Sequence, residues 1–353
     1  MTFLSDGKVL ASTFFNESTY LWDVSLWDIS NGKCIQTFSG NGPGEAAFSP
    51  DGKVIAVTTR VGKVRLLDVA TGDCKQTLNH GDRASTLAFS RHGGILASGS
   101  QVGFVRLWDA TITGDQSLSC HSQTVSAAAF SPEGKIVATG SCDKTVKLWD
   151  VSTGICKQTL AEHAAEVNTV AFPTEGKILA SGADDATVRV WDPMTGVCRH
   201  TLKTVARRLM FVTFSPDGAI LVAGTVGGAL TFWDPVTGAH KQTLKPGPGV
   251  CSVSFSVDST VFVTGSYCGG VWLCDVATWT CKKLTSQKVS CVAMSPGGKT
   301  FALTSAADTV ELWNAATEDC QQTIKTNFKA YGLSFSDNSR YLKTHDEVHA
   351  NPI

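Results

Sequence analysis

Two stretches of the chain carry a histidine, a hydroxyl residue and an aspartate at the same spacings. These residues are His121, Thr139 and Asp143 in the first stretch, and His163, Ser181 and Asp185 in the second. A hydroxyl beside a histidine that an aspartate orients is the arrangement of a hydrolytic triad. However, the set recurs in adjacent segments, its aspartate always lies six residues before a tryptophan, and no nucleophile-elbow or oxyanion-hole signature accompanies it. The sequence therefore favours a structural role over catalysis.

The segments that hold these residues have the pattern of short antiparallel strands joined by tight turns. In the first segment, apolar or alternating runs occupy residues 125–130, 136–139 and 145–149, and a fourth run follows at 155–160. Turn-forming residues such as Ser131-Pro132-Glu133-Gly134 separate the runs. Residues 121–150 therefore predict three strands, the run at 155–160 adds a fourth, and residues 163–192 begin the same unit again.

A closing pair, tryptophan followed by aspartate or a relaxed form of it, recurs along the chain every 39 to 42 residues. It falls at Trp27-Asp28, Leu67-Asp68, Trp108-Asp109, Trp149-Asp150, Trp191-Asp192, Trp233-Asp234, Cys274-Asp275 and Trp313-Asn314. A repeat of about forty residues with four strands and a closing Trp-Asp resembles the WD40 family. The resemblance implies an all-β fold, a WD40 β-propeller whose four-stranded antiparallel blades surround a central channel.

The number of blades depends on how the ring closes. Eight closing pairs favour eight blades, whereas a ring made of residues 32–314 would hold seven, the family's commonest number. We expect residues 1–344 to form a single propeller domain, with surplus strands at 330–344 and a loose tail at 345–353. We also expect the strand at 320–324 to seal the ring by pairing with the amino-terminal strands.

The first unit contains a duplication of five residues that supplies two tryptophans. Trp22 lies ten residues after Ser12, and Trp27 lies five residues before Gly32. In the fourth unit a single tryptophan, Trp149, satisfies both spacings, since it lies ten residues after Thr139 and five before Gly154. Because an odd insertion turns a strand over, we expect one tryptophan to be seated in the blade and five residues to loop out. The sequence leaves open which tryptophan is seated.

Composition and charge exclude several classes of protein. The chain has 30 Lys and Arg against 31 Asp and Glu in 353 residues, so no nucleic-acid or membrane affinity is expected. No secretory signal and no apolar run of membrane-spanning length is present, which predicts a cytoplasmic protein, and we expect it to be monomeric. No metal-ligand spacing, phosphate-binding loop or cofactor motif occurs, so we expect neither a metal nor a cofactor.

Six of the 12 cysteines occupy one slot of the repeat, near the start of its fourth strand. They are Cys34, Cys74, Cys156, Cys198, Cys281 and Cys320. Since they lie on separate blades, we expect them to be small buried residues that neither pair nor bind metal. Cys268 and Cys274 are close in sequence, but we expect no disulfide between them in a reducing cytosol.

The resemblance also assigns a role to the histidine, hydroxyl residue and aspartate. In WD40 blades these three side chains and the strand tryptophan form a buried hydrogen-bonded tetrad. The implied tetrads are His121, Thr139, Asp143 and Trp149, and His163, Ser181, Asp185 and Trp191. Such a set has a physical reason, because a buried polar group without a partner costs about 1–3 kcal/mol. The third unit keeps His80, Ser98 and Trp108 but has Val102 in the aspartate position.

Because the repeat chemistry lies inside the blades, we expect function to lie on the loops of one face. Candidate contact residues flank the start of a first strand or lie in the turn between the second and third strands. They are Arg60, Arg83, Gln101, Thr124, Glu166, Asn168, Asp184, Arg208, Met210, Tyr267 and Lys288. Arginine, tyrosine and methionine are enriched in interface cores. The basic residues among them predict an acidic protein partner.

The phrase Thr-Gly-x-Cys-x-Gln-Thr-Leu, which begins at Thr71 and at Thr153, is similar to repeats of fungal NACHT signalling ATPases of the vegetative-incompatibility group. Their WD repeats are thought to sense a ligand. This chain has no P-loop, so the resemblance implies a sensor module without its ATPase. Our first hypothesis is therefore a non-catalytic interaction scaffold or ligand-sensing module. The alternatives are a propeller enzyme or small-ligand binder that uses the channel, and a truncated WD array without a partner.

Overall fold

The chain folds into β-strands joined by short turns. The computed structural model describes residues 9–16, 21–28, 33–41, 46–59, 61–109, 115–119, 121–206, 208–295, 298–305 and 309–325. Within these residues the strands form eight antiparallel sheets, seven of four strands and one of three. Strands pair in chain order in every sheet, so that consecutive strands form hairpins. The predicted all-β architecture of four-stranded antiparallel blades is confirmed.

The sheets are numbered here from first to eighth along the chain. The first three are β1 (Val9–Asn16), β2 (Leu21–Asp28) and β3 (Lys33–Asn41); β4 (Ala46–Phe48), β5 (Val54–Thr58), β6 (Lys63–Asp68) and β7 (Cys74–Asn79); and β8 (Ala84–Phe89), β9 (Ile95–Ser100), β10 (Phe104–Asp109) and β11 (Asp115–Ser119). The fourth and fifth are β12 (Val125–Phe130), β13 (Ile136–Ser141), β14 (Val146–Asp150) and β15 (Cys156–Leu160); and β16 (Val167–Ala171), β17 (Leu179–Ala183), β18 (Thr187–Trp191) and β19 (Cys198–Lys203). The last three are β20 (Leu209–Phe214), β21 (Leu221–Thr225), β22 (Leu230–Trp233) and β23 (His240–Leu244); β24 (Val250–Phe255), β25 (Val261–Ser266), β26 (Val271–Asp275) and β27 (Cys281–Thr285); and β28 (Val289–Met294), β29 (Thr300–Ser305), β30 (Thr309–Asn314) and β31 (Cys320–Lys325).

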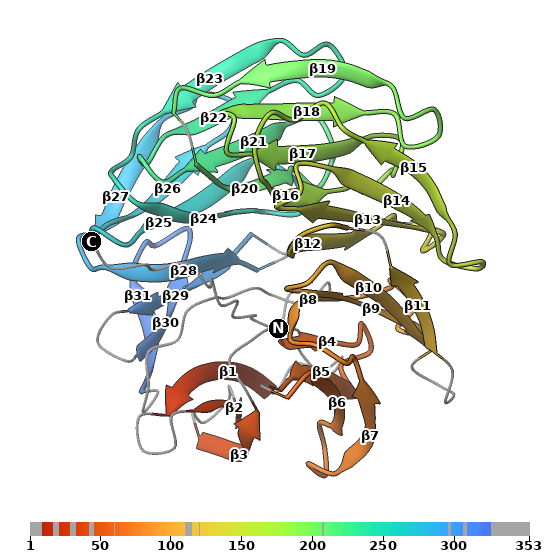
Figure 1. Cartoon of the computed structure of the whole chain (residues 1–353). Coiled ribbons are helices and arrows are strands. Elements are labelled where there is room, and N and C mark those ends of the chain that lie inside the picture. Colours follow the sequence, from red (N-terminus) through yellow and green to blue (C-terminus); the bar gives the residue numbers. More distant parts are fainter. Residues whose placement is uncertain are drawn as a thin grey trace.

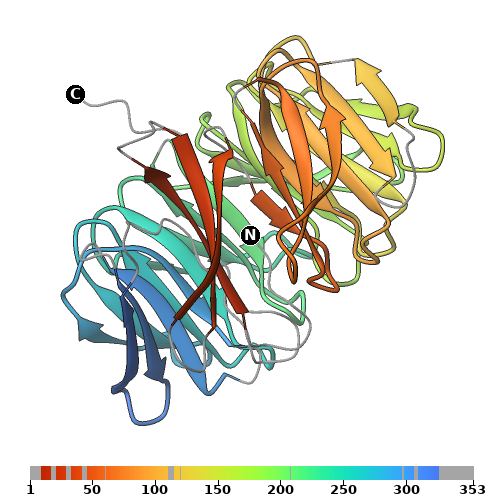
Figure 2. The same ribbon diagram turned by 90° about the horizontal axis from the view of Figure 1, so that it is seen from below.

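The eight sheets stand around a common centre, with the first strand of each four-stranded sheet innermost and the fourth outermost (Figure 1). The three-stranded first sheet lies between the eighth sheet and the second (Figures 1 and 2). The sheets nearest to the two ends of the chain are therefore neighbours in a ring.

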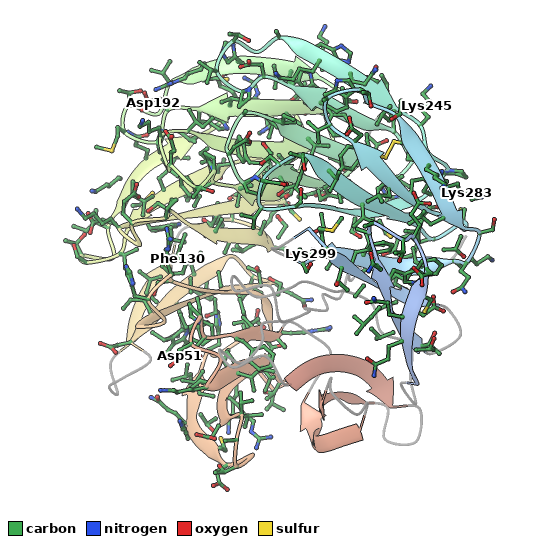
Figure 3. All side chains as sticks on the ribbon, turned by 180° about the vertical axis from the view of Figure 1, so that it is seen from behind. Asp51, Phe130, Asp192, Lys245, Lys283 and Lys299 are labelled. Atoms are coloured by element: carbon green, nitrogen blue, oxygen red, sulfur yellow. A yellow bond between two sulfur atoms is a disulfide. The ribbon has the colours of Figure 1, made fainter. Side chains whose placement is uncertain are left out.

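The hydrophobic core is divided into layers, each between two neighbouring sheets. One cluster of buried side chains joins Leu148 and Leu160 of the fourth sheet to Val167, Leu179 and Trp191 of the fifth. Similar clusters join each successive pair from the second sheet to the eighth. Side chains accordingly fill the spaces between the ribbons in Figure 3. Because a single sheet cannot bury its own apolar faces, each blade depends on its neighbours.

The aspartate of the closing pair caps the turn between the third and fourth strands. Asp150 Oδ1 accepts the N–H groups of Ser152 at 2.9 Å and Thr153 at 3.1 Å. Its second oxygen lies 2.6 Å from Lys157 Nζ. Asn314, in the last unit, accepts the two corresponding backbone bonds at 2.8 and 3.1 Å. The pair therefore combines a tryptophan for the blade interior with a side chain that fixes the next turn.

The expected closure of the ring is wrong. β31 pairs with β30, and not with the amino-terminal strands, because the outer strand of every sheet forms a hairpin with the strand before it. The expected surplus strands at 330–344 and the tail at 345–353 lie outside the described residues. A single domain over residues 1–344 stays a prediction.

The expected five-residue loop in the first unit is also wrong. β2 contains both Trp22 and Trp27, and it pairs with β1 without interruption. The additional residues lengthen the hairpin, since β2 has eight residues where β14 has five. Trp27 is paired with Cys34, as Trp149 is paired with Cys156, so the backbone register makes Trp27 the equivalent tryptophan.

A disulfide joins Cys274 of β26 to Cys281 of β27. Cys274 stands where other third strands have tryptophan, and that position is paired with the cysteine slot of the fourth strand. The expectation that slot cysteines do not pair is therefore wrong for Cys281. The expectation that the slot cysteines are buried is also wrong for Cys74 and Cys320, which are exposed. Cys268 is free and does not pair with Cys274.

We expect this disulfide to form in purified protein under oxidising conditions. Replacing both residues, Cys274→Ser with Cys281→Ser, should lower the free energy of unfolding by about 2 kcal/mol, because the bond restricts the unfolded chain. Denaturant unfolding measures this loss, with Cys268→Ser as the matched control. Alkylation of the unreduced protein followed by peptide mass spectrometry should leave Cys274 and Cys281 unlabelled. Labelling of both would contradict the assignment.

Candidate functional site: buried tetrads and the loop face

The structure brings together all four residues of each implied tetrad. In the fifth sheet Ser181 Oγ lies 2.7 Å from His163 Nε2, and His163 Nδ1 lies 2.9 Å from Asp185 Oδ2. The indole Nε1 of Trp191 donates to the same Ser181 hydroxyl at 2.7 Å. The fourth sheet repeats the arrangement, with three bonds of 2.8 Å among His121, Thr139, Asp143 and Trp149.

The tetrads have the connectivity of a catalytic triad but not its accessibility. Ser181 is fully buried and His163 is 5% exposed. The Ser181 hydroxyl accepts the indole hydrogen and can donate its own to His163 Nε2, because His163 Nδ1–H points to the carboxylate. Asp185 also accepts the backbone N–H groups of Ala164 and Thr187, each at 2.9 Å. Every polar group has a partner, and no substrate can reach the hydroxyl.

Burial and hydrogen bonding move the pKa values of the tetrad groups. Burial lowers the pKa of His121 and of His163 below the ordinary value for histidine, although the neighbouring carboxylates oppose this. Burial alone would raise the pKa of Asp143 and Asp185. Hydrogen bonds from threonine hydroxyls and the histidines outweigh it and hold both pKa values below the ordinary range. The folded state therefore favours neutral histidine and ionised aspartate.

The third sheet has an incomplete set. Trp108 Nε1 still donates to Ser98 Oγ at 2.8 Å, and His80 is 1% exposed. However, His80 Nε2 lies 3.5 Å from the backbone carbonyl of Ser98, and His80 Nδ1 has no hydrogen-bond partner in the structure. Val102 occupies the aspartate position and is 54% exposed. Loss of the aspartate thus leaves the histidine buried without its anion.

Apart from Arg60, which lies outside the described residues, the candidate contact residues lie in or beside two kinds of loop, whose common face we call the loop face. It consists of the loops from each outer strand to the next inner strand and of the turns between second and third strands. Backbone hydrogen bonds join the two kinds of loop, from Gln101 N to Arg83 O at 3.1 Å and from Asp184 N to Glu166 O at 2.9 Å. The same bond recurs from Cys142, Val226 and Tyr267 to Thr124, Arg208 and Gly249.

The candidates differ in how far they are available to a partner. Gln101, Glu166, Arg208 and Lys288 are exposed; Arg83, Thr124, Asn168, Asp184, Met210 and Tyr267 are half-buried; and Arg60 lies outside the described residues. Tyr267 packs against the core cluster of the seventh and eighth sheets. Thr124 donates its hydroxyl to Gln101 O at 2.8 Å.

Asn168 belongs to a set of bonds between inner strands that sequence reasoning missed. The second residue of an inner strand donates its side chain to a carbonyl of the next inner strand. Ser85 donates to Val125 O at 2.6 Å, and Asn168 donates to Leu209 O at 3.4 Å. Ser126 and Cys251 make the equivalent bonds to Val167 and Val289. The repeat spacing carries this signal, because these four residues recur at one slot, whereas Met210 has no donor there.

The exposed valines of the loop face were also missed. Val61, Val102, Val205 and Val226 are between 42% and 74% exposed. Val61 and Val102 occupy the aspartate position of the tetrad, and Val205 occupies the histidine position of the sixth sheet. The signal lies in the repeat, since these units lack a tetrad and place an apolar residue where the complete units have a polar one.

The repeat length, the order of strands in each sheet and the two complete tetrads define a WD40 β-propeller. A WD domain of the G-beta repeat type matches residues 72–109. The chain belongs to the family described as the IFT122 first beta-propeller, which matches residues 129–349, more than half of the chain. No curated protein matches the chain. The narrower resemblance to fungal NACHT proteins stays a prediction.

Two further findings concern the described part of the chain only. No group of three or more histidine, cysteine, aspartate or glutamate residues is placed there to hold a metal ion. The described residues also contain no helix with the length and apolar character that a membrane span requires.

The tetrad pKa shifts predict a loss of stability in acid. Since the folded-state pKa values of His121 and His163 lie below the unfolded value of about 6.5, unfolding takes up protons as the pH falls. Stability should be full above about pH 6.5 and fall below it, with a further loss below about pH 4 as Asp143 and Asp185 are protonated. Thermal unfolding between pH 8 and about pH 2 measures both steps.

The contribution of one tetrad is isolated by His163→Gln, which should reduce the dependence of Tm on pH between about pH 7 and pH 5. His92→Gln, at an exposed histidine, is the matched control and should keep the dependence of the wild type. An NMR titration of the wild-type imidazole rings gives an independent reading of His163. Titration of His163 at or above the ordinary histidine range would contradict the prediction.

Proposed function

We propose that this propeller is a non-catalytic interaction module that presents its loop face to a partner protein. WD40 propellers commonly serve as protein-interaction scaffolds. One observation carries the proposal for this chain. The side chains with catalytic chemistry are buried and bonded to one another, whereas exposed loop-face side chains differ from sheet to sheet. The fourth and fifth sheets repeat the same buried tetrad, whereas the side chains on the surface that a partner would contact vary.

Charge supports an acidic region on the partner. Exposed Arg208 and Lys288 and half-buried Arg83 lie on the loop face of the sixth, eighth and third sheets. Glu166 and Asp184 carry the opposite charge on the fifth sheet. The basic residues would attract a partner's acidic groups and help to orient it. A cytoplasmic location, a monomeric state and a ligand-sensing role stay predictions.

Affinity purification of the intact chain with quantitative mass spectrometry tests the proposal. Arg83→Gln, Arg208→Asn and Lys288→Gln together remove three charges, and asparagine suits the positive φ of 60° at Arg208. We expect recovery of partner proteins to fall roughly tenfold, since each exposed ion pair contributes about 0.2–1 kcal/mol. The binding that remains should depend less on salt.

The matched control changes the same number of charges on the opposite face. Lys135, Lys177 and Lys299 are exposed in the turns between first and second strands, and their replacement by glutamine should leave recovery unchanged. Equal recovery with both triple variants, each folded by circular dichroism, would overturn the loop face as the binding surface.

A further inference from the structure

One continuous part of the loop face lies at the junction of the fifth and sixth sheets. We call it the junction surface, and it consists of Glu166, Asp184, Val205, Val226 and Arg208. Its residues are far apart in the sequence, but hydrogen bonds show that the loops that hold them are neighbours. Asp184 N donates to Glu166 O, Thr204 N donates to Ala186 O, and Val226 N donates to Arg208 O, at 2.9, 2.9 and 3.1 Å. The loop that holds Val205 therefore lies over the turn that holds Asp184.

The centre of the junction surface is apolar and exposed. Val205 is 57% exposed and Val226 is 42% exposed. The loop of Val205 reaches the turn of Val226, because a Cβ placed on Gly227 would lie 3.9 Å from Ala206 Cβ. The sixth sheet has Val205 in the histidine position and Gly227 in the aspartate position, so no tetrad requires polar side chains here. Two valines held at the surface offer a contact for an aliphatic side chain.

One end of the junction surface is acidic. Asn168 Nδ2 donates to Asp184 Oδ1 at 2.6 Å and to Leu209 O at 3.4 Å, which fixes the Asp184 carboxylate beside the next sheet. Among the described residues, no cation lies within ion-pair distance of Glu166 or Asp184. Burial first, and then the charge of Glu166, raise the pKa of the neighbouring Cys142 to about 11. The smaller, electrostatic part of that shift comes from carboxylates that include Glu166 and Asp184.

The other end of the junction surface is basic. Arg208 is exposed, and its backbone carbonyl accepts the hydrogen bond from Val226. The junction surface therefore holds two carboxylates on the fifth sheet, and two valines and a guanidinium on the sixth. A partner with complementary chemistry would place a basic, an aliphatic and an acidic side chain on them. A uniformly acidic segment would be repelled by Glu166 and Asp184.

We propose that the junction surface binds an extended segment of a partner protein that carries a lysine or arginine, an aliphatic residue and an acidic residue. The basic side chain pairs with Glu166 and Asp184, the aliphatic one packs on Val205 and Val226, and the acidic one pairs with Arg208. This inference rests on the interaction function proposed above and assigns its recognition chemistry.

Fluorescence polarisation with defined peptides tests the assignment on the intact chain. The probe is a set of labelled nine-residue peptides in which Lys, Leu and Glu stand at the centre of a Gly-Ser background, at several spacings and in both directions. Single replacements of Lys, Leu or Glu by Ser form the rest of the set. We expect at least one spacing to bind about tenfold more tightly than its Lys→Ser version.

Protein variants connect each preference to its residues. Glu166→Gln with Asp184→Asn should abolish the preference for Lys and keep the preference for Leu. Val205→Ser with Val226→Ser should abolish the preference for Leu. Met194→Ser with Val236→Ser changes two exposed apolar residues in the turns between third and fourth strands, and should alter nothing. All variants are checked for folding by circular dichroism.

Three results would overturn the assignment. The first is Lys-dependent binding that survives the loss of both carboxylates. The second is the absence of Lys-dependent binding up to about 1 mM peptide. The third is self-association of the chain that Val205→Ser with Val226→Ser removes. The last would make a second copy of the chain the occupant. If the carboxylate variant keeps its partners while the triple loop-face charge variant loses them, the interaction function stands and the junction surface alone is wrong.

Discussion

A tryptophan indole that is buried between two sheets must find an acceptor for its N–H group. The fourth and fifth sheets meet this requirement with a threonine or serine hydroxyl, and a histidine and an aspartate complete the set of hydrogen bonds. The third sheet keeps only the first bond, from Trp108 to Ser98. The eighth sheet uses another acceptor, since Trp313 Nε1 donates to Glu311 Oε2 at 2.9 Å. At the same position the second and seventh sheets have Leu67 and Cys274, which carry no indole.

Sequence alone could predict the features that are local and repeated. The strand periodicity, the closing pairs and the tetrad positions lie within one unit of about forty residues, and each recurs often enough to be recognised. The structure places His163, Ser181, Asp185 and Trp191 within hydrogen-bonding distance of one another, as the repeat implied. Features that depend on pairing between strands were harder to predict, because register is set by turns and bulges.

The errors show which information was missing. In the fourth sheet, a bulge before the tryptophan of the third strand pairs Trp149 with Cys156. A register shift within β26 similarly pairs Cys274 with Cys281. The spacing of seven residues is the same in both pairs, so the disulfide was recognisable once the register was known. The duplication around Trp22 was misjudged for a different reason. A hairpin can accommodate additional residues by lengthening both strands. The prediction considered only which face of the strand each side chain would occupy, and therefore omitted this outcome.

The same constraint that organises the interior also shapes the surface. A complete tetrad draws a histidine and an aspartate from the loop face into the blade, and those residues are then unavailable to a partner. Where the tetrad is lost, the same two positions are free to carry other side chains. Val61, Val102 and Val205 stand at such positions and are exposed. A sheet that gives up part of its internal hydrogen bonding thereby gains surface positions whose side chains can vary. Since the fifth sheet keeps its tetrad and the sixth does not, the boundary between them joins a fixed carboxylate to an exposed apolar loop.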